Sequence, residues 1–407
     1  MGRLVPMLVV IGMCLLAVSP VVHSACFPAI FNFGDSTSDT GNLAASFPGF
    51  TPAEYPPYGD TYPGKPSNRY SDGRLLIDFI AQAYGLPFVD PYLQSVNSEF
   101  NQGTNFAAAG STVLPVTYLS PFYLDIQLRE YRTFKTNVQN VFNPPDGSVP
   151  DEAKKARLPS PEDFSTGLYT IALGGNDFTY GYTKGKTVLE VRDYLPQVIG
   201  NLTAAVKAHW GALPLKNCGV IFVVELFQSL YDYGGRNFVV WDIEPHGCLP
   251  YTLTLIPHTA ADLDADGCLI AYNDNAKWFN EQLQIALADL RANLTNVNLS
   301  IFNTYKLKSE LISANTTTNG FNFTTKACCG VPNEFNFDLR VNCGLSNVID
   351  GVNLTAVKCD DPNQYLVWDG VHNTDAANKY LANQFFGGSY FDPPFPVTPE
   401  GCTLSAI

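Results

Sequence analysis

The chain has 407 residues, of which 13% are aromatic, and its formal net charge is −14 at pH 7. The acidic balance argues against a polyanionic partner such as nucleic acid. A neutral or sugar-like substrate fits better, and aromatic rings are suited to line a groove for one, although most of them are expected in the core.

The N-terminus has the layout of a cleavable signal peptide. Arg3 precedes an apolar run from Leu8 to Val18, and small residues follow it. The run is shorter than the ~20 residues that span a bilayer, and no later segment indicates an anchor. We expect residues 1–24 to be removed and residues 25–407 to be secreted without a stable membrane anchor.

Glycosylation signals and cysteines agree with secretion. Six sequons have acceptors that we expect on exposed loops or turns: Asn201, Asn293, Asn298, Asn315, Asn322 and Asn353. Of ten cysteines, Cys14 lies in the signal peptide, which leaves nine. Their spacing is not that of a zinc site, so we expect disulfides of undetermined pairing and no metal. Nine is odd, and Cys218 is the candidate for the unpaired thiol.

Short apolar runs that end near glycines alternate with amphipathic segments along the chain. Strands are predicted at 28–33, 168–173, 238–241 and 299–304. Helices are predicted at 75–84 and 273–290, where apolar residues recur every three or four positions. This alternation favours a parallel sheet covered by helices on both faces. No linker divides the chain, so we expect a single domain.

Ser36 is the first candidate for chemistry. It follows the predicted strand at 28–33 and Gly34, which permits a sharp turn. A serine there can stand at a helix N-terminus, where free N–H groups face a developing negative charge. Ser36 and Asp39 also fit a helix cap. The local residues leave a nucleophile and a capping residue about equally open.

Asp369 and His372 are the second candidate. Their spacing places them on one side of a helical turn or tight loop. A serine hydroxyl needs a base that takes its proton, and an acid can orient that base. Asp-x-x-His alone is a weak motif. The other histidines after residue 25 have no acid at that spacing before them: His209, His246 and His258.

Two further segments contain candidate donors to an oxyanion. Asn176 follows the predicted strand at 168–173 and a glycine pair, and an amide donor of this kind contributes ~3 kcal/mol at related sites. The alternative is an Asn-Asp turn bonded to its own backbone. Gly110 lies in the small-residue segment 105–111 and offers its N–H, although ordinary packing explains such a segment equally well.

These four segments resemble the plant GDSL esterase/lipase family of the SGNH hydrolase superfamily. Their order along the chain is Ser36, Gly110, Asn176 and then Asp369 with His372. The resemblance extends over nearly the whole mature chain and includes the segments 69–74, 245–250 and 266–268. The branch it resembles includes early-nodulin-like esterases, acetylesterases and fucosidase-labelled proteins. It implies a three-layer α/β/α sandwich with a mainly parallel sheet.

The resemblance also implies the roles of individual residues. Ser36 is expected as the nucleophile, His372 as the base and Asp369 as the acid that orients it. The oxyanion hole is expected to consist of Ser36, Gly110 and Asn176.

Two features depart from the family. Thr37 stands where the family name has leucine, and we expect hydrolysis to survive because no proton transfer is assigned to that position. The stretch at about 206–227, which contains Cys218, is an atypical insertion, either a mistranslated intron or a surface excursion. Without it the mature cysteines would be even in number.

We therefore expect a secreted serine ester hydrolase of the carboxylesterase or acetylesterase type in the apoplast or cell wall. Its substrate is expected to be a small-molecule or polysaccharide ester, such as an acyl ester of a cell-wall sugar or small glycoside, with no cofactor. A lipase acting on longer acyl chains is an alternative. An α-L-fucosidase-type glycosidase needs two acids across a sugar bond, and no such pair stands out. A non-catalytic glycoprotein is the third alternative, and the oligomeric state stays open.

Overall fold

The computed structural model describes residues 26–116, 120–206, 230–313 and 320–407. A six-stranded sheet lies at its centre in the order β12-β5-β4-β3-β1-β2. Neighbouring strands are parallel except β12, which is antiparallel to β5. The strands are β1 (Ile30–Gly34), β2 (Gly103–Asn105), β3 (Leu168–Ala172), β4 (Asn237–Trp241), β5 (Asn298–Phe302) and β12 (Phe391–Asp392). The four predicted strands are confirmed, and β2 and β12 were not predicted.

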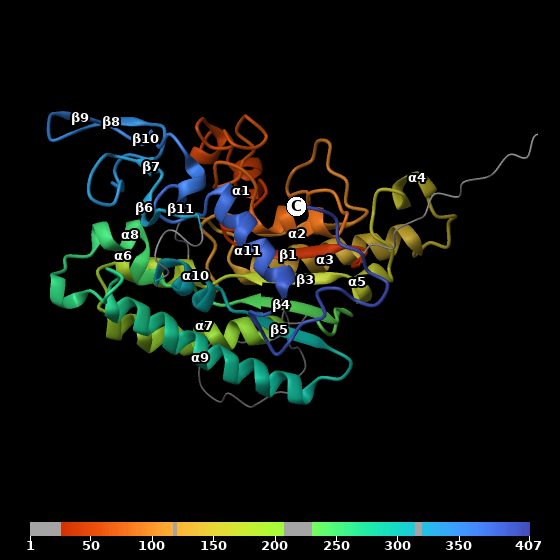
Figure 1. Cartoon of the computed structure of the whole chain (residues 1–407). Coiled ribbons are helices and arrows are strands. Elements are labelled where there is room, and N and C mark those ends of the chain that lie inside the picture. Colours follow the sequence, from red (N-terminus) through yellow and green to blue (C-terminus); the bar gives the residue numbers. More distant parts are fainter. Residues whose placement is uncertain (1–25, 117–119, 207–229, 314–319) are drawn as a thin grey trace, which may run out of the picture.

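Successive side chains of a strand point to opposite faces of the sheet, and here each face packs into its own apolar layer. Phe31 and Phe33 of β1 join one layer, whereas Ile30 joins the other. Helices α3 (Leu124–Phe142), α7 (Val188–Val206) and α9 (Ile270–Asn293) cover the first layer. Helices α2 (Leu76–Ala83), α10 (Thr304–Ser313) and α11 (Asp375–Gly387) cover the second. Figure 1 shows α7 and α9 below the sheet and α2 and α11 above it, so the three-layer prediction is confirmed.

Both predicted helices are present. The segment 75–84 forms α2, and the segment 273–290 lies within the longer α9. The remaining helices are α1 (Asn42–Ser46), α4 (Glu152–Lys155), α5 (Asp163–Thr166), α6 (Gly175–Thr183) and α8 (Pro250–Leu255). Four single 3₁₀ turns are also described, at Pro52–Glu54, His246–Cys248, Ala260–Asp262 and Pro362–Gln364.

Three small sheets lie toward the end of the molecule where β3 leads into α6 (Figure 1). They pair β6 (Phe323–Ala327) with β11 (Tyr365–Val367), β7 (Cys329–Gly330) with β10 (Val357–Lys358), and β8 (Ser346–Ile349) with β9 (Val352–Thr355). Because the side chains that follow parallel strands meet at this same end, these small sheets stand beside the expected site.

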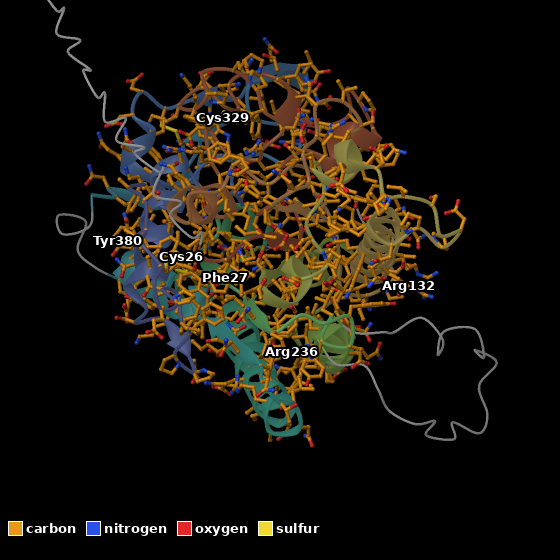
Figure 2. The ribbon with its side chains drawn as sticks, turned by 90° about the vertical axis from the view of Figure 1, so that its right-hand side faces the viewer. Cys26, Phe27, Arg132, Arg236, Cys329 and Tyr380 are labelled. Atoms are coloured by element: carbon orange, nitrogen blue, oxygen red, sulfur yellow. A yellow bond between two sulfur atoms is a disulfide. The ribbon has the colours of Figure 1, made fainter. Side chains whose placement is uncertain are left out.

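Four disulfides connect the described cysteines: Cys26–Cys402, Cys248–Cys268, Cys328–Cys359 and Cys329–Cys343. Cys26–Cys402 joins the two ends of the described chain. Cys328–Cys359 and Cys329–Cys343 hold the small sheets. Cys329 is labelled near the top of Figure 2. The ninth mature cysteine, Cys218, lies outside the described residues. So do the insertion beyond Val206 and residues 1–24.

The sequon acceptors do not all lie on loops. Asn201 is half-buried inside α7, contrary to the expectation of a loop or turn. Asn315 lies outside the described residues. The other four acceptors are exposed: Asn293, Asn298, Asn322 and Asn353. Of these, Asn293 ends α9, Asn298 begins β5 and Asn353 lies in β9, so the expectation of a loop or turn is wrong for them as well. Among the described acceptors it holds for Asn322 alone. None of the described helices is both long and apolar enough to cross a membrane.

Candidate active site

Ser36 lies in a turn after β1, with 9% of its surface exposed. The Asp39 N–H donates to the Asp35 carbonyl at 2.9 Å, which closes the turn. Helix α1 begins only at Asn42, and the Asp39 carboxylate accepts hydrogen bonds from the backbone at its start. Ser36 is therefore not at a helix N-terminus, and its interpretation as a helix cap is wrong.

Gly34 ends β1 where the chain has no room for a side chain. An added Cβ would lie 2.2 Å from Ser38 Oγ and 3.1 Å from the Ala172 carbonyl oxygen. The Gln127 amide of α3 holds the same residue, since it accepts from the Gly34 N–H at 3.0 Å and donates to the Gly34 carbonyl at 2.8 Å. Gly34 and Gln127 together hold the strand end that carries Ser36.

His372 lies between Ser36 and Asp369. Its Nε2 is 2.7 Å from Ser36 Oγ, and its Nδ1 is 2.7 Å from Asp369 Oδ2. The His372 N–H also donates to Asp369 Oδ1 at 3.0 Å, so the turn itself holds the carboxylate beside the ring. The structure thus brings the three residues together, with Asp369 and His372 in a tight loop between β11 and α11 and Ser36 in the turn after β1. With Nδ1–H donating to Asp369, Nε2 is free to accept from the Ser36 hydroxyl.

The electrostatic environment favours a charged pair. Burial alone lowers the pKa of His372, but the charge and hydrogen bond of Asp369, with smaller contributions from Asp35 and Glu244, raise it overall. Burial alone raises the pKa of Asp369, but the charge and hydrogen bond of His372 and the hydrogen bond from Tyr58 lower it overall. Each partner therefore stabilises the ionised form of the other.

The expected oxyanion donors lie at the same site. Asn176 is in the first turn of α6, and its Nδ2 donates to the Ser111 carbonyl at 2.9 Å. The alternative of an Asn-Asp turn is therefore wrong. The bond to Ser111 uses one of the two N–H groups of the amide and holds the other in a defined place. Gly110 has a φ of +76°, and neither its N–H nor that of Ser36 donates to another described residue.

Asp177 connects α6 to the segment beside Gly110. Its carboxylate accepts hydrogen bonds from the Val113 and Leu114 N–H groups at 2.8 and 3.0 Å. Burial raises the pKa of this carboxyl to about 7 although those hydrogen bonds oppose the shift. Asp177 thus holds the start of α6, which contains Asn176, against the segment that follows Gly110, a role that the sequence did not indicate.

A cavity of about 330 Å³ opens beside Ser36. Among the described residues that line it, Asp369 and His372 are the only acidic or basic side chains. Its other walls are largely aromatic and aliphatic, and include Phe50, Tyr70, Tyr251, Phe337 and Leu339. The cavity is of a size that encloses a small organic ligand, and its lining suits a neutral one.

The segment 69–74, which carries part of the family resemblance, contacts the start of α11, which follows the Asp369–His372 turn. The Asp375 N–H, at the start of α11, donates to Asp72 Oδ1 at 2.7 Å. The Arg74 guanidinium pairs with the Asp375 carboxylate. Tyr58, from a neighbouring loop, donates to Asp369 Oδ2 at 2.7 Å. The sequence carried no signal for Tyr58, which is one of 21 tyrosines.

Thr37, which departs from the family, also forms contacts in the Ser36 turn. Its N–H and its hydroxyl both donate to Asp35 Oδ1, at 3.0 and 2.8 Å. Burial raises the pKa of Asp35 to about 6, and these hydrogen bonds oppose that shift. Thr37 therefore stabilises the Asp35 carboxylate, and its own hydroxyl is directed to that group.

A second, smaller cavity of about 80 Å³ lies behind the Ser36 turn, on the side of Asp35 and Thr37. Buried Lys308 is bonded there to Glu244 and, at 2.6 Å, to Asn373 Oδ1. Among the described residues no group of three or more His, Cys, Asp or Glu side chains is arranged to hold a metal ion.

A mainly parallel α/β/α fold with hydrogen-bonded serine, histidine and aspartate at the wall of a largely apolar cavity is the arrangement of a serine hydrolase. The family model of GDSL-like lipase/acylhydrolases matches residues 30–385. The chain therefore belongs to that family and is a hydrolase acting on ester bonds, which confirms the resemblance seen in the sequence.

Curated plant relatives match along nearly their whole length. A GDSL esterase/lipase of Arabidopsis thaliana is 40% identical over 376 residues, covering 91% of this chain and 90% of the relative. Alpha-L-fucosidase 3 of Arabidopsis thaliana is 37% identical over 380 residues, covering 92% and 94%. An esterase of Hevea brasiliensis is 37% identical over 393 residues, covering 95% and 92%.

Proposed function

We propose that this protein is a secreted serine carboxylesterase that cleaves small acyl esters of plant cell-wall sugars or small glycosides through an acyl-enzyme on Ser36. One observation carries the proposal: His372 lies within 2.8 Å of both Ser36 and Asp369, at the wall of a cavity with no other acidic or basic lining residue among those described. The four disulfides support secretion, because such bonds persist in oxidising compartments.

The proposed reaction has two halves. Ser36 Oγ attacks the ester carbonyl carbon and its proton passes to His372 Nε2, while Asp369 stabilises the imidazolium. The N–H groups of Ser36 and Gly110 and the Asn176 amide bind the oxyanion. The carbon–oxygen bond to the alcohol breaks, and the alcohol leaves with the proton from His372. Water then attacks the acyl group by the same route, which releases the acid and returns the proton to Ser36.

Substitution of Ser36 tests the proposal. Ser36→Ala is expected to abolish hydrolysis of an aryl acetate and labelling by a fluorophosphonate probe. Ser38→Ala is the matched control, because Ser38 is a buried serine of the same turn outside the cavity lining. A folded parent protein that neither hydrolyses esters nor labels at Ser36 contradicts the proposal and favours a non-catalytic glycoprotein. Assays on acetylated xylan, pectin and xyloglucan then show which sugar the enzyme accepts as the alcohol part of the ester.

The name of the fucosidase relative suggests glycoside cleavage as a rival activity. Two carboxyl groups across the sugar bond are needed for it, whereas Asp369 is the one acid among the described lining residues and is bonded to His372. We expect Ser36→Ala to lose activity on the aryl acetate and the parent to be inactive on an aryl fucoside. Fucoside cleavage that persists in Ser36→Ala, with no acetate activity in the parent, refutes the ester proposal.

The rim of the cavity favours longer acyl chains as a second candidate substrate class. Phe50 and Leu339 both line the cavity, yet they are 66% and 52% exposed. Apolar side chains at a cavity mouth can cover a chain that extends beyond the site. A panel of aryl esters from acetate to palmitate distinguishes the two classes, since an acetylesterase loses kcat/KM as the chain lengthens and a lipase gains it.

A further inference from the structure

Tyr58 is a buried phenol in contact with the candidate catalytic acid. It is 2% exposed, and its hydroxyl donates to Asp369 Oδ2 at 2.7 Å. Its ring packs edge-on against Trp368 and Tyr70, with centroids 6.0 and 6.1 Å apart. Because Tyr70 and Trp368 pack against the Tyr58 ring, the position of the Tyr58 hydroxyl is fixed.

The hydrogen bonds to Asp369 show what Tyr58 contributes. Asp369 Oδ1 accepts from the backbone N–H groups of Val371 and His372, at 3.3 and 3.0 Å. Among the described residues, Asp369 Oδ2 is hydrogen-bonded to Tyr58 and to the His372 ring. The backbone therefore holds one oxygen and Tyr58 holds the other, so the plane of the carboxylate faces Nδ1 of the ring.

The Tyr58 hydroxyl keeps its proton and acts as a hydrogen-bond donor. Burial, followed by the negative charge of Asp369, raises the pKa of Tyr58 well above its ordinary value. A protonated hydroxyl beside a carboxylate can only donate to it. Asp369 in turn is stabilised in its charged form, which is the form that orients an imidazole.

We propose that Tyr58 is a positioning residue for the Asp369–His372 pair, so that the catalytic arrangement has four members instead of three. This inference rests on the proposed serine esterase function. Tyr58 acts through Asp369: it holds the carboxylate in the orientation that keeps His372 Nδ1 protonated and Nε2 directed at Ser36 Oγ.

A double-mutant cycle tests the proposal. Tyr58→Phe keeps the ring and is expected to lower kcat about ten-fold, the scale of one lost hydrogen bond to a charged group, with little change in KM. In an Asp369→Asn background the same substitution is expected to have almost no effect, because the two changes act on one interaction. Tyr84→Phe is the control, since Tyr84 is equally buried and donates to the Val397 carbonyl away from the cavity.

NMR titration of His372 gives a readout that does not depend on turnover. His372 faces Asp369 on its own turn, Asp35 from the turn after β1, Glu244 from the segment after β4, and the Tyr70 ring. Without the hydrogen bond from Tyr58, the Asp369 carboxylate stabilises the charged His372 ring more strongly, so Tyr58→Phe is expected to raise the pKa of His372. Tyr84→Phe is expected to leave that pKa unchanged.

The outcomes separate this inference from the proposed function. An unchanged His372 titration in Tyr58→Phe, or a loss of kcat that is the same with and without Asp369, overturns the positioning role. A parent without Ser36-dependent hydrolysis overturns the proposed function, and the titration still decides whether Tyr58 acts on the pair.

Discussion

Arg74 and Asp375 form three hydrogen bonds across 301 positions of the chain. The Arg74 backbone N–H donates to Asp375 at 2.6 Å, and its Nε and Nη2 each donate at 3.0 Å. The two side chains are only 18% and 7% exposed. Because Asp375 begins α11 shortly after His372, this pair holds the Asp369–His372 turn against the segment 69–74.

Loss of the Arg74 side chain is expected to destabilise the protein. Arg74→Met keeps much of the volume but leaves Asp375 with fewer partners in a buried place, so the free energy of unfolding should fall by about 2 kcal/mol. Denaturant titration measures this change in the free energy of unfolding. Arg129→Met, which removes an exposed pair with Asp125 on α3, should cost at most about 0.5 kcal/mol. Equal losses in the two variants would contradict a special role for Arg74.

The pH dependence of hydrolysis should follow His372. Only the neutral ring can take the Ser36 proton, and the pKa of His372 is raised. Activity should therefore fall as the pH decreases, with a midpoint of kcat/KM above the ordinary imidazole value of about 6.5.

Substitution of Glu244 tests the cause of that midpoint. Glu244→Gln removes one of the charges that raise the pKa of His372, so the midpoint should move to lower pH. Glu152→Gln, at a carboxylate whose side chain is 78% exposed, should leave it in place. A midpoint below that of free imidazole in the parent protein would be inconsistent with the described charges.

Asn176 should affect the rate more than binding. An oxyanion donor acts mainly in the transition state, so Asn176→Ala should lower kcat by about 100-fold or more with little change in KM. Asn280→Ala is a matched control, because that amide bonds the Ile243 backbone outside the cavity lining. A raised KM with normal kcat would instead place Asn176 in binding of the ground state.

The Cys329–Cys343 disulfide should shape the cavity. The loop that it closes contributes Phe337, Leu339 and Val341 to the wall. Replacing both cysteines by serine should lower the free energy of unfolding by about 3 kcal/mol, the value for a loop of this length, and raise KM as the wall loosens. Removing Cys26–Cys402 should destabilise the protein without raising KM at a temperature where it stays folded. A similar rise of KM in both variants would argue against a role for the wall.

Much of the fold could be predicted because its determinants are local. Short apolar runs placed β1, β3, β4 and β5, because strands of a covered sheet are buried on both faces, and three- to four-residue spacing placed α2 and α9, because each of these helices buries one face. The short strands β2 and β12, of three and two residues, offered too few positions for a period to be recognised. The helix cap at Ser36 was wrong because the helix begins later, at Asn42, whose backbone N–H donates to the Asp39 carboxylate at 2.6 Å.

The sequence by itself determined the class of protein and the candidates for chemistry, because Ser36, Gly110, Asn176, Asp369 and His372 each stand in a short segment with a recognisable local pattern. Only the tertiary structure decided how these segments meet. The distance of 2.7 Å between Ser36 and His372, the support of Asp369 by Tyr58, and the pairing of Arg74 with Asp375 all join residues that are hundreds of positions apart. Such contacts depend on how loops pack at the end of the sheet, and no local period or spacing encodes that packing.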